Sequence, residues 1–155
     1  MNANLRIVDL KVDCGFVPQY VHLRNRYCEL LLTYPVNVQE TKEWLASANI
    51  VVKGIVDGNS LLGAVLLYID RGAEIAVFVG RKGDGVGVKL LITIEDAARI
   101  HGLSDIWAWV RQDNISAIRL FRKSGYLQQT ETSRVYSSCA IKGYVFKKAL
   151  CDRVR

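Results

Sequence analysis

The chain has 155 residues, half of them hydrophobic, and its 21 Lys and Arg against 15 Asp and Glu give a net charge of +6 at pH 7. This composition excludes an intrinsically disordered chain, and the length suits a single domain over residues 1–155. The longest apolar run, residues 61–69, falls short of the roughly 20 residues that span a membrane. With no signal-peptide pattern at the N-terminus, we expect a cytoplasmic protein without a membrane partner.

The cysteine and histidine positions argue against a metal site. The four cysteines form no CxxC pair or zinc spacing, and there are only two histidines. The positive charge attracts phosphate groups, but the chain has no arginine-rich run, zinc finger or RNP motif. We therefore expect neither a metal nor a nucleic-acid partner, and a phosphate-bearing small molecule accounts for the charge equally well.

The first half of the chain predicts a strand, two helices and three further strands. Alternation of apolar and polar residues predicts the strand 5–12. Pro18 can open a helix whose apolar positions recur every three or four residues through Leu31, and Pro35 ends it. A short helix is expected at 38–48. The strands 50–56 and 61–69 flank an Asp-Gly-Asn-Ser turn, and the strand 74–79 follows.

The second half alternates helices and strands. Four glycines fall within residues 80–87, and an amphipathic helix then runs to Gly102. The strand 106–110 is apolar on both faces and should lie inside a sheet. A helix begins at residues 113–114 and ends at Gly125, and the strands 126–132 and 144–150 complete the chain. This order predicts an α/β domain with a mixed sheet.

The strand, glycine-rich loop and helix at residues 74–102 carry the clearest chemical signal. Glycines allow close approach of a ligand to the backbone, and a helix N-terminus binds phosphate through free N–H groups. Arg81, Lys82 and Lys89 could add positive charge. The alternative is a tight turn without a ligand. A Walker A motif is excluded because Val88-Lys89 follow Gly87, and a dinucleotide fingerprint is excluded by the late position of the loop.

Two linked motifs resemble the GNAT acetyltransferase superfamily. They are Lys82-x-x-Gly85-x-Gly87 and Asn114-x-x-Ala117-x-x-x-Phe121-x-x-x-Gly125-Tyr126. The resemblance covers residues 61–126 and implies a single-domain GNAT fold. Its mixed, mostly antiparallel sheet would be splayed between the fourth and fifth strands and flanked by helices. The implied activity is an N-acetyltransferase with acetyl-CoA as co-substrate, acting by direct attack in a ternary complex.

The resemblance also implies a set of cofactor-binding residues. The loop and helix start would cradle the pyrophosphate, and the strand 74–79 would pair with pantetheine through its end. These residues are Phe78, Val79, Arg81, Lys82, Gly83, Asp84, Gly85, Val86, Gly87 and Val88. Asn114 would bind the pantetheine arm, although a helix N-cap explains it equally well. Phe121 would pack near the thioester.

Two departures from the family pattern affect the expected chemistry. Lys82 stands where the family has Arg or Gln, so phosphate binding would depend more on backbone N–H groups. Phe121 stands where many members have the tyrosine that protonates the CoA thiolate, and Phe cannot donate a proton. Tyr126, Ser124 or water could replace it. Glu74 matches the position of a catalytic base in many members, with a solvent-facing strand residue as the alternative.

The acceptor is the least specified part of the prediction. Arg24 and Asn25, followed by an acidic helix with Trp44, resemble the branch that acetylates nucleotide-linked amino sugars, of the pseudaminic-acid-pathway type. We therefore expect Arg24 and Asn25 to bind a small-molecule amine. They could instead be the polar face of the first helix. A protein or peptide amine, or a CoA-binding module without catalysis, are the alternative functions. The expected assembly is a monomer or homodimer.

Overall fold

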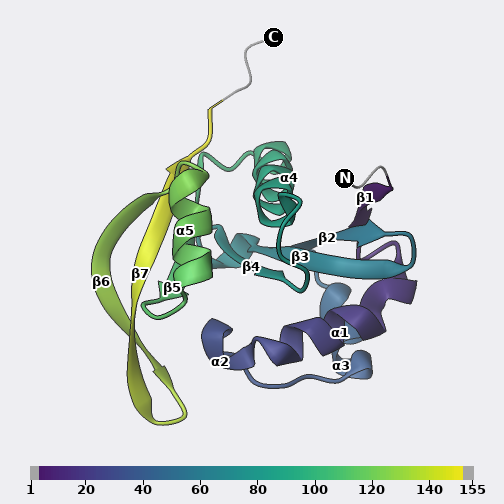
Figure 1. Cartoon of the computed structure of the whole chain (residues 1–155), viewed down its shortest axis with the longest axis horizontal. Coiled ribbons are helices and arrows are strands. Elements are labelled where there is room, and N and C mark those ends of the chain that lie inside the picture. Colours follow the sequence, from purple (N-terminus) through teal and green to yellow (C-terminus); the bar gives the residue numbers. More distant parts are fainter. Residues whose placement is uncertain (1–3, 152–155) are drawn as a thin grey trace.

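Seven strands form one twisted sheet in the computed structural model, which describes residues 4–151 (Figure 1). The sheet order is β1-β2-β3-β4-β5-β7-β6, and every neighbouring pair is antiparallel except β4 and β5. The strands are β1 (Leu5–Asp9), β2 (Ile50–Asp57), β3 (Ser60–Tyr68), β4 (Glu74–Val79), β5 (Asp105–Arg111), β6 (Leu127–Tyr136) and β7 (Cys139–Ala149).

Helices cover both faces of the sheet, with an apolar cluster under each layer (Figure 1). One face carries α1 (Val17–Arg26), α2 (Cys28–Leu31) and α3 (Val38–Leu45), and the other carries α4 (Val86–Ile100) and α5 (Ile115–Lys123). Short 3₁₀ turns, η1 (Cys14–Phe16) and η2 (Ile69–Arg71), precede α1 and β4. Because β2 and β3 are buried on both faces, their sequences are nearly continuous apolar runs rather than alternating ones.

The sheet opens between β4 and β5. These two strands pair in parallel at a single position, Glu74 opposite Trp107, and then diverge. The α/β fold with a mixed, mostly antiparallel sheet splayed between the fourth and fifth strands is therefore confirmed. The gap matters for function because it leaves the edge of β4 without a strand partner along most of its length.

The first predicted helix is interrupted in the structure. Tyr27 leaves helical geometry (φ −108°, ψ 11°) and separates α1 from the single turn of α2. Leu32 then adopts a left-handed conformation (φ 53°), which turns the chain before Pro35 is reached. The apolar spacing alone could not show this break, because α1 and α2 continue to present apolar residues to the same layer.

The last two strands are longer than predicted and form a hairpin over residues 127–149. Ser137 and Ser138 both have positive φ (50° and 65°), as a tight hairpin turn requires. The usual signal for such a turn is Asn-Gly or Asp-Gly, and a pair of serines does not carry it. The N-terminal strand is shorter than predicted and ends at Asp9, whose side chain accepts a hydrogen bond from Lys11 N–H (2.9 Å).

Candidate functional site

A loop of left-handed residues turns the chain from β4 into α4. Gly83, Asp84 and Gly85 have φ values of 95°, 57° and 68°. Gly85 is the N-cap of α4, and the first α-type hydrogen bond of the helix runs from Lys89 N–H to its carbonyl (3.0 Å). The N–H groups of the first helical turn therefore lack intrahelical α-type partners, which gives this end of α4 a partial positive charge.

A second helix N-terminus lies beside the first. The Asn114 side-chain oxygen caps α5 by accepting a hydrogen bond from Ala117 N–H (3.3 Å). At Gly87, a Cβ atom would lie 2.9 Å from the Cδ2 atom of Leu120 on α5. The glycine at this position thus allows α4 and α5 to approach closely, so that both N-termini border the same space.

The unpaired edge of β4 forms one wall of that space. Gly80 N–H donates to β3 (2.7 Å), whereas the Ala73 carbonyl accepts from Trp107 N–H on β5 (3.2 Å). Because hydrogen-bonding direction alternates along a strand, odd-numbered residues of β4 turn their backbone groups towards β5. Beyond the single pairing position, Val77 and Val79 therefore present N–H and carbonyl groups to the gap.

Tyr27 closes the gap from the side of α1. Its hydroxyl donates to the Val79 carbonyl (2.7 Å), and its ring stacks on Phe78 with centroids 6.3 Å apart. Leu30 and Leu31 continue this apolar wall. The break between α1 and α2 lies at Tyr27 itself, so the interruption of the first helix is what places these side chains at the gap.

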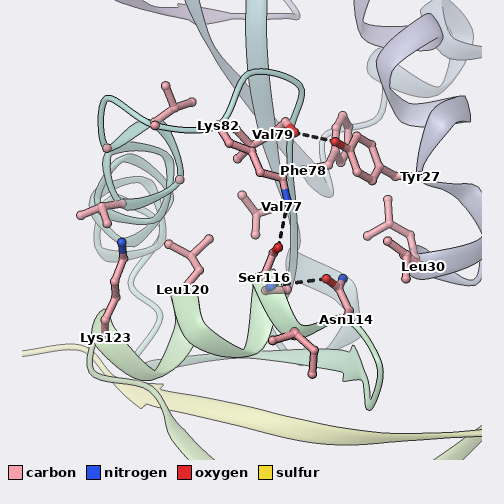
Figure 2. Close-up of a pocket in the computed structure, with 18 of the residues that line it drawn as sticks. Tyr27, Leu30, Val77, Phe78, Val79, Lys82, Asn114, Ser116, Leu120 and Lys123 are labelled. Carbon is pink, nitrogen blue, oxygen red and sulfur yellow. Dashed lines mark hydrogen bonds between the residues drawn. The ribbon is translucent and has the colours of Figure 1, made fainter. Parts of the chain in front are cut away.

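These elements enclose a pocket of about 450 Å³ (Figure 2). Nine predicted cofactor-binding residues line it: Phe78, Val79, Lys82, Gly83, Gly85, Val86, Gly87, Val88 and Asn114. Residues that the sequence did not predict complete the lining: Tyr27, Leu30, Leu31, Val77, Asp113, Ile115, Ser116, Ala117, Leu120 and Lys123. Those on α5 flank the predicted Asn114, and Val77 is two residues from Val79, so chain proximity was the available signal. Nothing in the sequence indicated Tyr27, Leu30 or Leu31.

Lys82 supplies the loop cation that reaches into the pocket. Its ammonium group donates to the Ser116 hydroxyl at the start of α5 (2.8 Å), and Figure 2 shows the side chain extending across the space between the two helices. Lys123 borders the same pocket from the C-terminal end of α5. Lys82, Lys123 and the N-termini of α4 and α5 all border the pocket, which makes it attractive to anions.

Three predicted cofactor residues lie outside this lining. Arg81 points to a different cavity, beside α1, and forms ion pairs with Asp57 (3.5 Å) and Asp84 (3.4 Å). Asp84 is thereby engaged with Arg81 rather than with the pocket. Phe121 is 2% exposed and packs in the core, edge-on to Tyr126 with ring centroids 5.0 Å apart.

Tyr126 and Ser124, the alternative proton donors, also lie away from the pocket lining. The Tyr126 hydroxyl donates to the buried Glu95 carboxylate (2.8 Å), which also accepts from the Lys148 ammonium (3.0 Å). Burial, reinforced by the negative charge of Glu95, raises the pKa of Tyr126 far above its ordinary value. The Ser124 hydroxyl is buried and has no hydrogen-bond partner within the part of the chain that the structure describes.

Glu74 occupies the opening of the sheet, on the α1 side. Its carboxylate forms an ion pair with Arg134 of β6 (2.9 Å), and its side chain is only 13% exposed. The Arg134 guanidinium also lies over the rings of Trp107 (5.6 Å) and Trp109 (5.0 Å). The arrangement holds a charged carboxylate next to the point where β4 and β5 separate.

Arg24 and Asn25 hold the segment between α2 and α3. The Arg24 guanidinium donates to the Tyr34 carbonyl (3.1 Å), and the Asn25 amide exchanges hydrogen bonds with the backbone of Val36 (2.9 and 3.0 Å). Asn25 is thus committed to the backbone of this segment. Arg24 also borders a cavity of about 300 Å³ beneath α1 and α3.

The tip of the β6–β7 hairpin reaches the same segment from the other side. The Tyr136 hydroxyl donates to the Thr33 carbonyl (2.9 Å), and its ring stacks on Tyr34 with centroids 5.1 Å apart. These contacts join residues more than 100 positions apart in the sequence, and they connect the hairpin tip to the segment between α2 and α3.

Residues 4–151 contain no group of three or more His, Cys, Asp and Glu side chains arranged to hold a metal ion. Within the same range, no helix combines the length and the apolar character needed to cross a membrane.

Solved structures with the same fold come from several bacteria. The Salmonella typhimurium protein yncA, solved with its cofactor acetyl-CoA, has a TM-score of 0.82 at 17% identity, over 98% of this chain and 97% of that one. Spermidine N-acetyltransferase from Vibrio cholerae, in complex with CoA and spermine, has a TM-score of 0.80 at 17% identity, over 96% and 97%. A Salmonella typhimurium acetyl transferase that modifies the N-terminal serine of ribosomal protein L7/L12 has a TM-score of 0.76 at 14% identity, over 97% of each chain.

The comparison with sequence families is more specific than the shared fold. No curated protein sequence matches the chain. The model of the acetyltransferase (GNAT) family matches residues 18–126, which include the splayed strands, the glycine loop, both helix N-termini and Glu74. Because this match spans well over half of the sequence, the chain belongs to the acetyltransferase (GNAT) family and is an acetyl-CoA-dependent N-acetyltransferase.

Proposed function

We propose that the protein transfers the acetyl group of acetyl-CoA to a primary amine of a small-molecule acceptor, by direct attack within a ternary complex. The pocket bordered by β4, α4 and α5 is the observation that carries this proposal. One end is bordered by the N-termini of α4 and α5, and the other by Tyr27 and Leu30 on the α1 side. A long ligand could therefore enter with its phosphates at the helix N-termini and its reactive end beyond Val77, towards Glu74, which itself lies outside the pocket lining.

The pyrophosphate of acetyl-CoA would lie against the glycine loop and the start of α4. The free N–H groups of the first helical turn and the helix dipole favour negative charge at this position. Lys82, Gly83, Gly85, Val86, Gly87 and Val88 would make these contacts. We assign Arg81 and Asp84 a role in shaping the loop, because their ion pair (3.4 Å) joins its two sides.

The pantetheine arm would pair with β4 in the manner of an added strand. Val77 and Val79 turn their backbone groups to the gap, so an extended chain could form alternating hydrogen bonds with them. The Tyr27 hydroxyl, which now occupies the Val79 carbonyl, would have to share or yield that acceptor. Asn114 has its oxygen engaged as the cap of α5, which leaves its amide N–H groups for the arm.

In the reaction, the amine nitrogen attacks the thioester carbonyl carbon. A C–N bond forms, the C–S bond breaks, the amine loses a proton, and the CoA thiolate leaves and acquires one. We assign the first proton to Glu74, directly or through water, since a carboxylate at the opening of the sheet can accept it. Phe121 cannot supply the second proton, Tyr126 and Ser124 lie outside the pocket lining, and the Tyr126 hydroxyl is engaged with Glu95, so we assign that step to water.

The contact between the tip of the β6–β7 hairpin and the segment between α2 and α3 favours a small acceptor. Tyr136 stacks on Tyr34 there, and we expect this contact to limit the room for an extended peptide to pass across β4. A nucleotide-linked amino sugar is the small acceptor that the Arg24-Asn25 resemblance favours, and we retain it as a proposal. A protein N-terminus remains the alternative acceptor, with a residue or two entering from the rim.

Release of free thiol from acetyl-CoA in the presence of a panel of primary amines tests this function. We expect release to depend on the amine, with small-molecule amines preferred over peptide amines of equal basicity. Binding of CoA without release for any amine would identify a non-catalytic CoA-binding module. A preference for peptide N-termini would transfer the proposal to a protein acceptor.

A further inference from the structure

The cavity beneath α1 and α3 differs from the CoA pocket in its chemistry. It has a volume of about 300 Å³ and lies on the other face of the sheet from α4 and α5. Its lining residues are Tyr20, Arg24, Val36, Glu40, Thr41, Trp44, Tyr68 and Arg71. Arg24 and Arg71 are cationic, Tyr20, Trp44 and Tyr68 are aromatic, and Glu40 carries a carboxylate.

Two guanidinium groups and two phenol hydroxyls meet at this cavity. Tyr20 is completely buried, and the Arg24 guanidinium interacts with its oxygen, but among residues 4–151 the Tyr20 hydroxyl donates to no acceptor. A buried hydroxyl proton without an acceptor costs free energy, and a bound ligand with acceptor oxygens would remove that cost. Glu40 is the carboxylate at this cavity, and one of its oxygens already receives a hydrogen bond from the Asn37 amide (2.8 Å).

Tyr68 connects the cavity to the catalytic end of β4. It stands directly opposite Glu74 in the β3–β4 register, and the Arg71 guanidinium lies 4.3 Å from the centre of its ring. Burial raises the pKa of Tyr68, whereas the positive charges of Arg24 and Arg71 oppose that shift. Both guanidinium groups therefore face the same phenol, next to the carboxylate proposed to receive the acceptor's proton.

We propose that this cavity binds an anionic group of the acceptor, so that the substrate is a primary amine carrying a carboxylate or phosphate. Arg24 and Arg71 would contact the anion, the Tyr20 hydroxyl would donate to it, and Trp44 and Tyr68 would hold the adjoining carbon skeleton. Guanidinium groups suit both carboxylate and phosphate oxygens. The inference rests on the acetyltransferase function proposed above and specifies the substrate class of its acceptor side.

Matched pairs of amines test the proposal. ω-Amino carboxylates of increasing length are compared with their uncharged amides, and aminoalkyl phosphates of the same length with the corresponding alcohols. Thiol release should favour the anionic member of each pair by about tenfold or more, corresponding to about 1.4 kcal/mol. The carboxylate and phosphate series together show which anion the cavity prefers.

Three variants locate the effect. Arg71→Gln should raise KM for the anionic amine about tenfold while KM for acetyl-CoA is unchanged, as expected for one lost charge-assisted contact. Arg6→Gln removes the same charge from β1 at the far edge of the sheet and should behave as wild type. Tyr20→Phe should raise KM for the anionic amine and leave the protein at least as stable, because it removes an unpaired hydroxyl.

The outcomes separate this inference from the proposed function. Equal rates with charged and uncharged amines, or an Arg71→Gln variant indistinguishable from Arg6→Gln, would overturn the anion site while leaving acetyl transfer in place. If no amine releases thiol, calorimetric titration of the same ω-amino carboxylates and aminoalkyl phosphates, with CoA saturating, still decides the point. Heat of binding that is lost in Arg71→Gln supports the cavity, and its absence in the wild type refutes it.

Discussion

The two sides of β4 differ in whether backbone groups or side chains form the site. On the α4 and α5 side, the pocket consists largely of backbone: a left-handed loop, two helix N-termini and the unpaired edge at Val77 and Val79. On the α1 side, the proposed acceptor site consists of charged side chains such as Arg24, Glu74 and Arg134. A backbone site can bind any ligand with a fixed phosphate chain, whereas a side-chain site can be changed for each acceptor. The proposed sites for acetyl-CoA and for the acceptor thus lie on opposite sides of β4.

The largest effect should come from obstructing the backbone side. Gly87 lines the pocket, and even a Cβ there would lie 2.9 Å from the Leu120 Cδ2 atom, so the indole of Gly87→Trp takes up space that the ligand needs. We expect CoA affinity to fall by about 100-fold or more, which is about 2.7 kcal/mol. Calorimetric titration with CoA measures this directly.

A matched control uses the same helix. Ile92 is 45% exposed on α4, so Ile92→Trp adds the same ring without entering the pocket. Circular dichroism should show both variants folded. Wild-type CoA affinity in folded Gly87→Trp would contradict the proposed pyrophosphate position.

The next largest effect should arise on the side-chain side, at Glu74. Glu74→Gln keeps the shape and removes the charge, and kcat near pH 7 should fall by about 100-fold, within the usual range for acid–base catalysis. The deficit should shrink as pH rises, because more of the acceptor amine is then already neutral. Steady-state kcat measured across the pH range checks both expectations, and CoA affinity should be unchanged.

Two further variants distinguish a base from a structural ion pair. Arg134→Gln breaks the same 2.9 Å contact but retains the carboxylate, whereas Glu131→Gln makes the same chemical change at an exposed site on β6. If Glu74→Gln and Arg134→Gln lose activity equally and without pH dependence, Glu74 only positions Arg134. Glu131→Gln should match the wild type.

The same division explains what could be predicted from sequence. The glycine loop, the α5 cap and the order of strands are encoded in short, continuous segments, and the predicted Gly85, Gly87 and Asn114 do line one pocket. Glycine is required there for φ values and close approach that other residues resist, so the signal is local and strong.

The acceptor side could not be predicted in this way. The contact of Tyr136 with Thr33 joins residues 103 positions apart, and it depends on a serine turn and a helix break that have no strong sequence signature. Even within the motif, Phe121 shares the family position but packs in the core beside Tyr126, because side-chain direction is decided by packing.

Phe121→Tyr tests that last difference. Its hydroxyl would enter a core formed with Tyr126 and Phe146, and an unpaired hydroxyl there should cost about 1–3 kcal/mol of stability. Since the ring lies outside the pocket lining, kcat should change by less than about threefold, equivalent to about 0.6 kcal/mol. Denaturant unfolding and thiol release measure the two quantities.

Phe146→Tyr is the appropriate comparison, because it adds the same hydroxyl to the same aromatic cluster without occupying the motif position. The two variants should lose similar stability. A gain in kcat confined to Phe121→Tyr would show that this position reaches the thioester during the reaction, and the backbone side would then include a proton donor.

We expect the smallest effect in the pH dependence of stability, for which one buried tyrosine from each side of β4 can be compared. The pKa of both Tyr126 and Tyr20 is raised, mainly by burial. The folded protein therefore retains these phenol protons above pH 10, where the unfolded chain loses them, so their contribution to stability is complete below pH 10 and falls as pH rises. Tyr126→Phe and Tyr20→Phe should each make this alkaline loss less steep.

At neutral pH the two variants should differ in sign. Tyr126→Phe removes a hydroxyl that donates to Glu95 at 2.8 Å and should cost about 1–3 kcal/mol. Tyr20→Phe removes a hydroxyl that donates to no acceptor within residues 4–151 and should cost little or stabilise the free protein. Urea unfolding at pH 7 and pH 10.5 measures both effects. Equal costs at pH 7 would mean that the Tyr20 hydroxyl is satisfied within the free protein, and the acceptor side would then be as complete without its ligand as the core around Glu95.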